Sequence, residues 1–152
     1  MKKHPQISQE EAIFCDIGDM TLMEKRFLYC ALLHIEEHNL VLTADQHITF
    51  DASLYAQHFD ESLENAYKSL KTGLLALFER EFKFIRFTES GSKCSTTSRW
   101  VGSVHYTDAH LTVGAYFAPC THQFLIELMR KKQAIGLTLD SFKEKTERLL
   151  EA

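Results

Sequence analysis

The chain has 152 residues, of which 45% are hydrophobic and 25% are charged, and its formal net charge at pH 7 is −4. This length is enough for one domain with a core of its own, and the composition is that of a globular protein, which excludes fibrous and disordered classes. No apolar run approaches the ~20 residues that a membrane helix needs, and MKKHPQISQEEAIF lacks the apolar stretch of a signal peptide, so we expect a cytoplasmic protein.

The charge is unevenly distributed along the chain. Residues 1–64 carry four Lys and Arg against twelve Asp and Glu (−8), residues 65–100 carry seven against three (+4), and residues 101–152 carry six of each. The overall charge argues mildly against nucleic-acid binding, but electrostatic potentials are screened within about 8–10 Å, so the local balance matters more. The middle third of the chain is therefore basic although the whole chain is acidic.

Helical periodicity begins at a capping box. Thr21 is followed by Glu24 three residues later, and apolar residues then recur at helical spacing, which predicts a helix that starts at Thr21. The segment HITF (47–50) is short and β-rich, and it predicts a strand. DASLYAQHF then predicts a short helix with Asp51 or Ser53 as its N-cap.

ENAYKSLKTGLLALFER (64–80) predicts an amphipathic helix, with Asp60 or Ser62 as its N-cap. A glycine inside a helix costs up to about 1 kcal/mol relative to alanine, so Gly73 indicates close approach of another backbone unless it is simply tolerated. The residues expected to face outward are Asn65, Lys68, Lys71 and Thr72.

After Arg80 the apolar period changes from 3.6 to 2. Pro119 ends the sheet, THQFLIELMRKK predicts another helix, and the segment beyond Gly136 predicts a last one. The elements expected between these residues are strands at 82–87, 99–106 and 111–117, with a polar loop at 88–98.

This order of elements is that of a winged helix. Two adjacent short helices are followed by a strand–loop–strand unit, so we predict an α+β fold, a winged helix-turn-helix with a small antiparallel sheet. The 64–80 helix is then the one that can lie in a groove, and the loop 88–98 is the wing. With no internal repeat or Pro/Gly-rich linker, we expect a winged-helix domain at 10–135 and a helical extension at 136–152.

Several segments stand in the order and spacing of a known family. The chain resembles the N-terminal winged-helix domain of the initiator replication proteins of iteron-type plasmids in the segments MTLMEKRFLYCALLHI, LYAQHF, ENAYKSLKTGLLALFER, SRWVGSVHY and FAP, and the resemblance covers about residues 10–130. Members typically carry two such domains: the first dimerises and touches the DNA backbone, and the second reads the iteron. After LIELMRKK the usual continuation into the second domain is not recognisable, so the resemblance implies backbone binding with little sequence selectivity.

The polar face of the 64–80 helix and the wing supply the expected contacts. Amides and cations position a protein on DNA through phosphates without reading bases. From spacing alone, lysines on a polar helix face are more often solvated surface, but the order of a wing and the resemblance both favour binding. The candidate DNA-binding residues are Asn65, Lys68, Lys71, Lys93 and Arg99.

The resemblance also implies partners: origin repeats in double-stranded DNA, a second copy of the chain and host replication proteins. An edge strand of the sheet or the last predicted helix could bury against the second copy, and that helix could equally pack on its own domain.

Two other function classes fit parts of the sequence. One is a protein-interaction module for dimerisation or regulation, a winged helix whose acidic residues 1–64 bind protein without direct contact to DNA. The other is a small metal-dependent enzyme, because His34 and His38 lie four residues apart on one helix face. A zincin needs Glu where this chain has Ile35, and no nucleophile elbow or phosphate loop is present. We therefore predict no catalytic residue, metal or cofactor.

Overall fold

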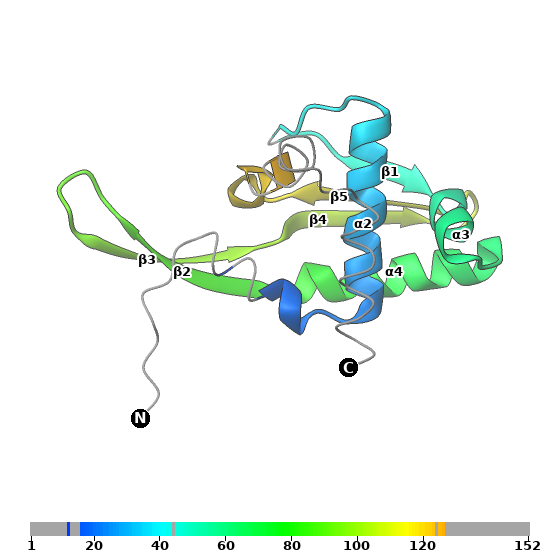
Figure 1. Ribbon diagram of the computed structural model, residues 1–152, viewed down its shortest axis with the longest axis horizontal. Coiled ribbons are helices and arrows are strands. Elements are labelled where there is room, and N and C mark those ends of the chain that lie inside the picture. Colours follow the sequence, from blue (N-terminus) through cyan, green and yellow to red (C-terminus); the bar gives the residue numbers. More distant parts are fainter. Residues whose placement is uncertain (1–11, 13–15, 44, 124, 127–152) are drawn as a thin grey trace, which may run out of the picture.

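The computed structural model describes residues 12, 16–43, 45–123 and 125–126. Helices pack against one face of a three-stranded sheet, and a β-hairpin extends away from one end of this body (Figure 1). None of the helices in the described part of the chain is long and apolar enough to cross a membrane. The elements are α2 (Leu22–Glu37), β1 (Ile48–Asp51), α3 (Ser53–Phe59), α4 (Leu63–Glu79), β2 (Glu81–Phe87), β3 (Lys93–Arg99), β4 (Val101–Thr107) and β5 (Thr112–Phe117).

The two sheets are separate. In the larger one the strand order is β1–β5–β4, with antiparallel pairing throughout, and the smaller one is the antiparallel β2–β3 hairpin. Ile48 and Phe50 of β1 are buried, whereas Thr49 and Asp51 are exposed, so alternate residues face the helices and solvent. The core is completed by apolar side chains of α2 and α4.

Two of the predicted helix starts are confirmed, and one is wrong. Thr21 caps α2 in a full capping box with Glu24, and Ser62 caps α4 by accepting a hydrogen bond from the Asn65 backbone N–H. The N-cap of α3 is Ala52, not Asp51 or Ser53. The Asp51 carboxylate accepts from the Ser53 backbone N–H at 2.8 Å, which is a local turn contact rather than a cap.

Asp60, the other residue considered for the α4 cap, ends α3 instead. Its backbone lies in the left-handed region with φ of 54°. Aspartate tolerates that conformation better than most residues, so it closes α3 and allows the chain to turn into α4 within three residues.

The predicted loop at 88–98 is largely wrong. Only residues 88–92 form the turn, because Lys93–Arg99 is strand β3, paired with β2 from Glu81↔Arg99 to Phe87↔Lys93. Ser and Thr are common in turns, but they also occur in strands when they lie opposite aromatic residues, as Thr96 does opposite Phe84. The predicted strand at 99–106 is accordingly divided at Trp100, whose side chain is fully buried.

The helix predicted from THQFLIELMRKK is seen in part, since the described residues from 119 to 126 are helical. The last predicted helix and the boundary between residues 10–135 and 136–152 lie outside the described residues.

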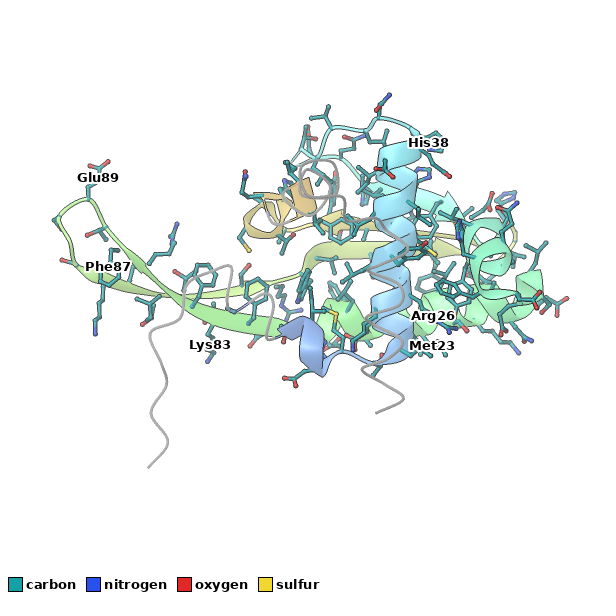
Figure 2. All side chains as sticks on the ribbon, in the orientation of Figure 1. Met23, Arg26, His38, Lys83, Phe87 and Glu89 are labelled. Atoms are coloured by element: carbon teal, nitrogen blue, oxygen red, sulfur yellow. The ribbon has the colours of Figure 1, made fainter. Side chains whose placement is uncertain are left out.

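Gly73 marks the place where α4 crosses α2, at the level of Met23 (Figure 2). A Cβ atom at position 73 would lie 2.6 Å from the Met23 carbonyl carbon and 3.1 Å from the Glu24 backbone nitrogen. Both neighbours are backbone atoms at the start of a capped helix, which cannot move aside without shifting α2. Close backbone approach, not tolerance, therefore explains the glycine.

The base of the hairpin is joined to the start of α2 by Arg80, the C-cap of α4. Its guanidinium donates to Glu24 Oε2 at 2.6 Å and to Asp16 Oδ1 at 3.1 Å. The other oxygen of Asp16 accepts from the Trp100 indole N–H at 2.6 Å. Glu24 is only 2% exposed, so its charge is balanced by Arg80 rather than by water.

Gly73→Ala is expected to lower the free energy of unfolding by about 1–3 kcal/mol, because the new methyl group forces α2 and α4 apart. Urea denaturation followed by circular dichroism measures this change. Gly18→Ala is the control, because a Cβ there meets no described atom within 4 Å. A Gly73→Ala variant as stable as the wild type would contradict the close crossing.

Arg80→Met is expected to cost about 3 kcal/mol or more, because it leaves the Glu24 carboxylate buried without its partner. Adding Glu24→Gln should recover part of this loss, since glutamine still serves in the capping box and removes the charge. Arg86→Met, at an exposed cation of β2, should change stability by less than about 0.5 kcal/mol. Strictly additive effects of the Arg80 and Glu24 substitutions in urea denaturation would argue against this coupling.

Candidate nucleic-acid interface

The hairpin presents two chemically different faces. Alternation along β2 puts Phe82 and Phe84 on one face, where both are buried and the Phe82 ring lies 5.7 Å from that of Trp100. The opposite face is exposed and carries Lys83 of β2 and Lys93 of β3. We call this opposite face the basic face of the wing; its members are Glu81, Lys83, Ile85, Phe87, Lys93, Ser95, Thr97 and Arg99.

Lys83 is a candidate residue that sequence reasoning missed. It lies directly opposite Thr97 in the ladder, on the same face as Lys93. The period-2 pattern of FKFIRF already puts Lys83 on the opposite face of the strand from Phe82 and Phe84, so the sequence did indicate its position. The segment that contains Lys93 was predicted to be a loop. No strand was therefore expected to pair with β2 and bring Lys93 onto the same face as Lys83.

Lys93 lies in β3 beside the turn, not inside a loop, and it is exposed. Figure 2 places Phe87, its partner in the ladder, near the far end of the hairpin, and Lys83 closer to the body. The two lysines are therefore spread along the hairpin rather than clustered.

Arg99, at the base of the hairpin, has a structural contact. Its Nη1 donates to the Phe78 backbone carbonyl at 2.9 Å, and its guanidinium carbon lies 5.5 Å from the Phe78 ring centre. Carbonyls in the last turn of a helix have no partner within the helix, and cations favour that end. Arg99 thus helps to fix the angle between α4 and the wing, although its side chain is exposed.

On α4, Asn65 and Lys68 are exposed, whereas Lys71 is held by neighbours. Lys71 Nζ lies 3.4 Å from Asp108 Oδ1 and 4.3 Å from the centre of the Tyr106 ring. Its charge is therefore partly neutralised by a carboxylate from the turn between β4 and β5. Lys68 has the more available charge.

Asp108 also accepts a hydrogen bond from the Tyr67 hydroxyl. Burial, together with this bond and the nearby carboxylate, raises the pKa of Tyr67 to about 12. The same hydrogen bond and the Lys71 ammonium lower the pKa of Asp108. Tyr67 is buried, as expected for a core residue, and with Asp108 and Lys71 it ties α4 to the β4–β5 turn.

The five predicted residues form a line, not a pocket. Asn65, Lys68 and Lys71 lie in the N-terminal half of α4, which is about 25 Å long. Arg99 lies at the other end of that helix, and Lys93 at the far end of a strand about 23 Å long. Because α4 and the hairpin lie end to end in Figure 1, the cations follow the long axis of the molecule.

The histidine pair of α2 lies elsewhere, beside an open hollow of about 470 Å³ between α2, β1 and α3. The His34 and His38 rings are 4.3 Å apart, and His38 Nδ1 is 3.1 Å from the His34 carbonyl oxygen. Burial and then the neighbouring His38 lower the pKa of His34. Glu37 and Asp51 give the hollow an acidic lining. Within the described ranges, no group of three or more His, Cys, Asp or Glu residues is placed to hold a metal.

Comparison with known proteins agrees with this architecture. The model of the family described as initiator replication protein, WH1, matches residues 7–144. The chain is also similar to the crystal structure of the WH1 domain of MSBI1.176, a replication protein isolated from a multiple sclerosis patient. Sequence identity to that domain is 28% and the TM-score is 0.74, over 81% of this chain and 93% of the other. No protein with a curated description matches significantly.

These matches confirm the predicted α+β winged-helix fold and the resemblance noted in the sequence. The family is one of replication initiators and is non-catalytic. Since its model spans most of the chain, the chain belongs to the WH1 family of initiator replication proteins.

Proposed function

We propose that this chain binds origin DNA mainly through the phosphate backbone, with α4 and the basic face of the wing as its contact surface. Membership of the initiator family implies origin DNA as a partner. The observation that carries the proposal is the exposure of Lys83 and Lys93 on one face of a projecting hairpin.

The chemistry of that face suits phosphates. Ser95 lies between the lysines in the ladder and Thr97 lies directly opposite Lys83, and both add hydroxyl donors. Residues 81–99 carry four Lys and Arg against two Glu, a net charge of +2 in a chain of −4 overall. Lysines that neutralise phosphates release condensed counterions. Lysines and hydroxyls both fix the orientation of the protein on the backbone, but they carry little sequence information.

The α4 residues extend the same line of contacts. We propose Asn65 and Lys68 as phosphate contacts, with Lys71 and Arg99 contributing less because Asp108 and the Phe78 carbonyl already hold them. A line of donors along the long axis suits an extended polyanion better than a small ligand. We expect the resulting affinity to be modest and similar for different sequences.

We further propose that acidic surfaces of this chain serve protein contacts, including self-association and binding of host replication proteins. Residues 1–64 carry a net charge of −8, and the hollow beside Glu37 and Asp51 is on this part. DNA is repelled by such a surface, which leaves it available to another protein. Within the described residues, β1 also forms one outer edge of the larger sheet, where a strand from a partner could pair.

Removing the lysines should weaken duplex binding and flatten its salt dependence. Lys83→Ala with Lys93→Ala is expected to reduce the slope of log K against log salt by about 0.9 for each phosphate that the variant no longer neutralises. Lys68→Ala with Lys71→Ala should act in the same direction, mainly through Lys68. Fluorescence anisotropy between about 50 and 200 mM salt, with iteron-like and random duplexes, measures both the affinity and the slope.

A net-charge control separates position from total charge. Glu37→Gln with Asp45→Asn, added to the Lys83 and Lys93 variant, restores the net charge at exposed sites outside α4 and the wing. Affinity should stay low in this variant if the wing makes the contacts. Unchanged slopes in both lysine variants, or no binding by the wild type at low salt, would overturn the DNA-binding surface; sedimentation of the same samples would then test the protein-interaction role.

A further inference from the structure

Phe87 is an aromatic residue left in solvent at the far end of the wing. Its side chain is 61% exposed, and it ends β2 directly before the turn. Figure 2 shows it near the tip of the hairpin, distant from the core. Single exposed apolar residues are common, so exposure alone assigns no role to this ring. The residues around Phe87 do indicate a role for it.

One cation, Lys93, lies beside this ring. Lys93 lies directly opposite Phe87 in the ladder, and alternation puts Lys83 on the same face. Arg86, the preceding residue, adds a third cation on the other face of the same strand. An apolar ring with one ammonium group beside it and a second on the same face matches a ligand that is anionic outside and apolar inside, as a DNA duplex is with its phosphates and stacked bases.

The turn that follows Phe87 is well ordered by hydrogen bonds. The Thr88 backbone N–H donates to the Ser92 carbonyl at 2.9 Å, and the Ser92 N–H donates to the Thr88 hydroxyl at 3.1 Å. Gly91 supplies the positive φ of 87° that the turn requires. Because Phe87 sits beside a closed turn, little backbone conformational entropy is lost when its ring is buried in a complex.

Glu89 restricts how DNA can approach. Its carboxylate lies in the turn, at the very tip of the hairpin in Figure 2. Phosphates are repelled from that tip, so an approach by the end of the hairpin is disfavoured. An approach by the basic face brings Lys83 and Lys93 toward the backbone, and Phe87, which lies opposite Lys93 on that face, then also meets the duplex.

The geometry points to Phe87 as an apolar wedge that enters the minor groove of duplex DNA and partly unstacks one base step. This inference rests on the proposed DNA-binding function and extends it to deformation of the duplex. Wedges of this kind bend DNA away from the protein side and favour steps that unstack easily, such as TA. The wing would thereby distinguish flexible sites from stiff ones without reading bases.

The test uses the full chain and a duplex of about two helical turns. The duplex carries a central TA step, fluorophores at its two ends and 2-aminopurine beside the step; a matched duplex has GC in its place. The wild type should shorten the end-to-end distance and raise the 2-aminopurine fluorescence. Phe87→Ala should lose both signals and bind the TA duplex roughly tenfold more weakly, while Phe87→Trp retains them.

Val41→Ala is the matched control, because Val41 is 70% exposed and lies in the loop between α2 and β1. It should bend and unstack DNA as the wild type does. A Phe87→Ala variant that still bends and unstacks the duplex overturns the wedge while leaving backbone binding intact. Absence of wild-type binding overturns the proposed function itself. If Phe87→Ala instead disrupts only self-association in sedimentation, or only binding to anionic vesicles, Phe87 is a protein or membrane contact and the wedge is wrong.

Discussion

The guanidinium of Arg80 holds together three parts of the chain that are distant in sequence. Arg80 is the C-cap of α4, and its guanidinium donates to Glu24 in the first turn of α2 and to Asp16. The Asp16 carboxylate also accepts from the Trp100 indole N–H, between β3 and β4. The wing begins at the residue after Arg80 and returns at Trp100. The two ends of the hairpin are thus attached to the same charged network, and the direction of the wing depends on it.

That network also links stability to the candidate binding surface. Glu24 has two roles, since it completes the α2 capping box and pairs with Arg80 while its own side chain is almost fully buried. Close by, the absence of a side chain at Gly73 lets α4 cross the start of α2. Backbone contact holds α4 and charge holds the base of the wing, so the backbone positions that carry these cations are set before a ligand binds. Such preorganisation lowers the entropic cost of binding an extended ligand.

Not every cation on this line is equally available to a ligand. Lys71 is bound to Asp108 and stacked on Tyr106, and Arg99 donates to the end of α4. These interactions stabilise the domain and reduce the charge that each residue can offer to a phosphate. Lys68, Lys83 and Lys93 are exposed, so the proposed contact surface is weighted toward the N-terminal half of α4 and the wing.

Local sequence signals determined much of this protein. The capping box at Thr21, the Ser62 cap and the change of period after Arg80 each depend on residues close together in the chain, so α2, α4 and β2 were predictable, as was the winged-helix order. The exposed polar face of α4, with Asn65 and Lys68, followed from the same helical spacing.

Only the tertiary structure decided the rest, because the deciding partners are far apart in sequence. The Ser- and Thr-rich segment 93–99 is a strand because β2 lies beside it, and this pairing is what brings Lys83 and Lys93 onto one face. Whether Gly73 was required or tolerated depended on the Met23 backbone, fifty residues earlier in the chain. The structural contacts of Lys71 and Arg99 likewise come from Asp108 and Phe78. Spacing within one element cannot reveal such contacts, since they arise only when the elements pack.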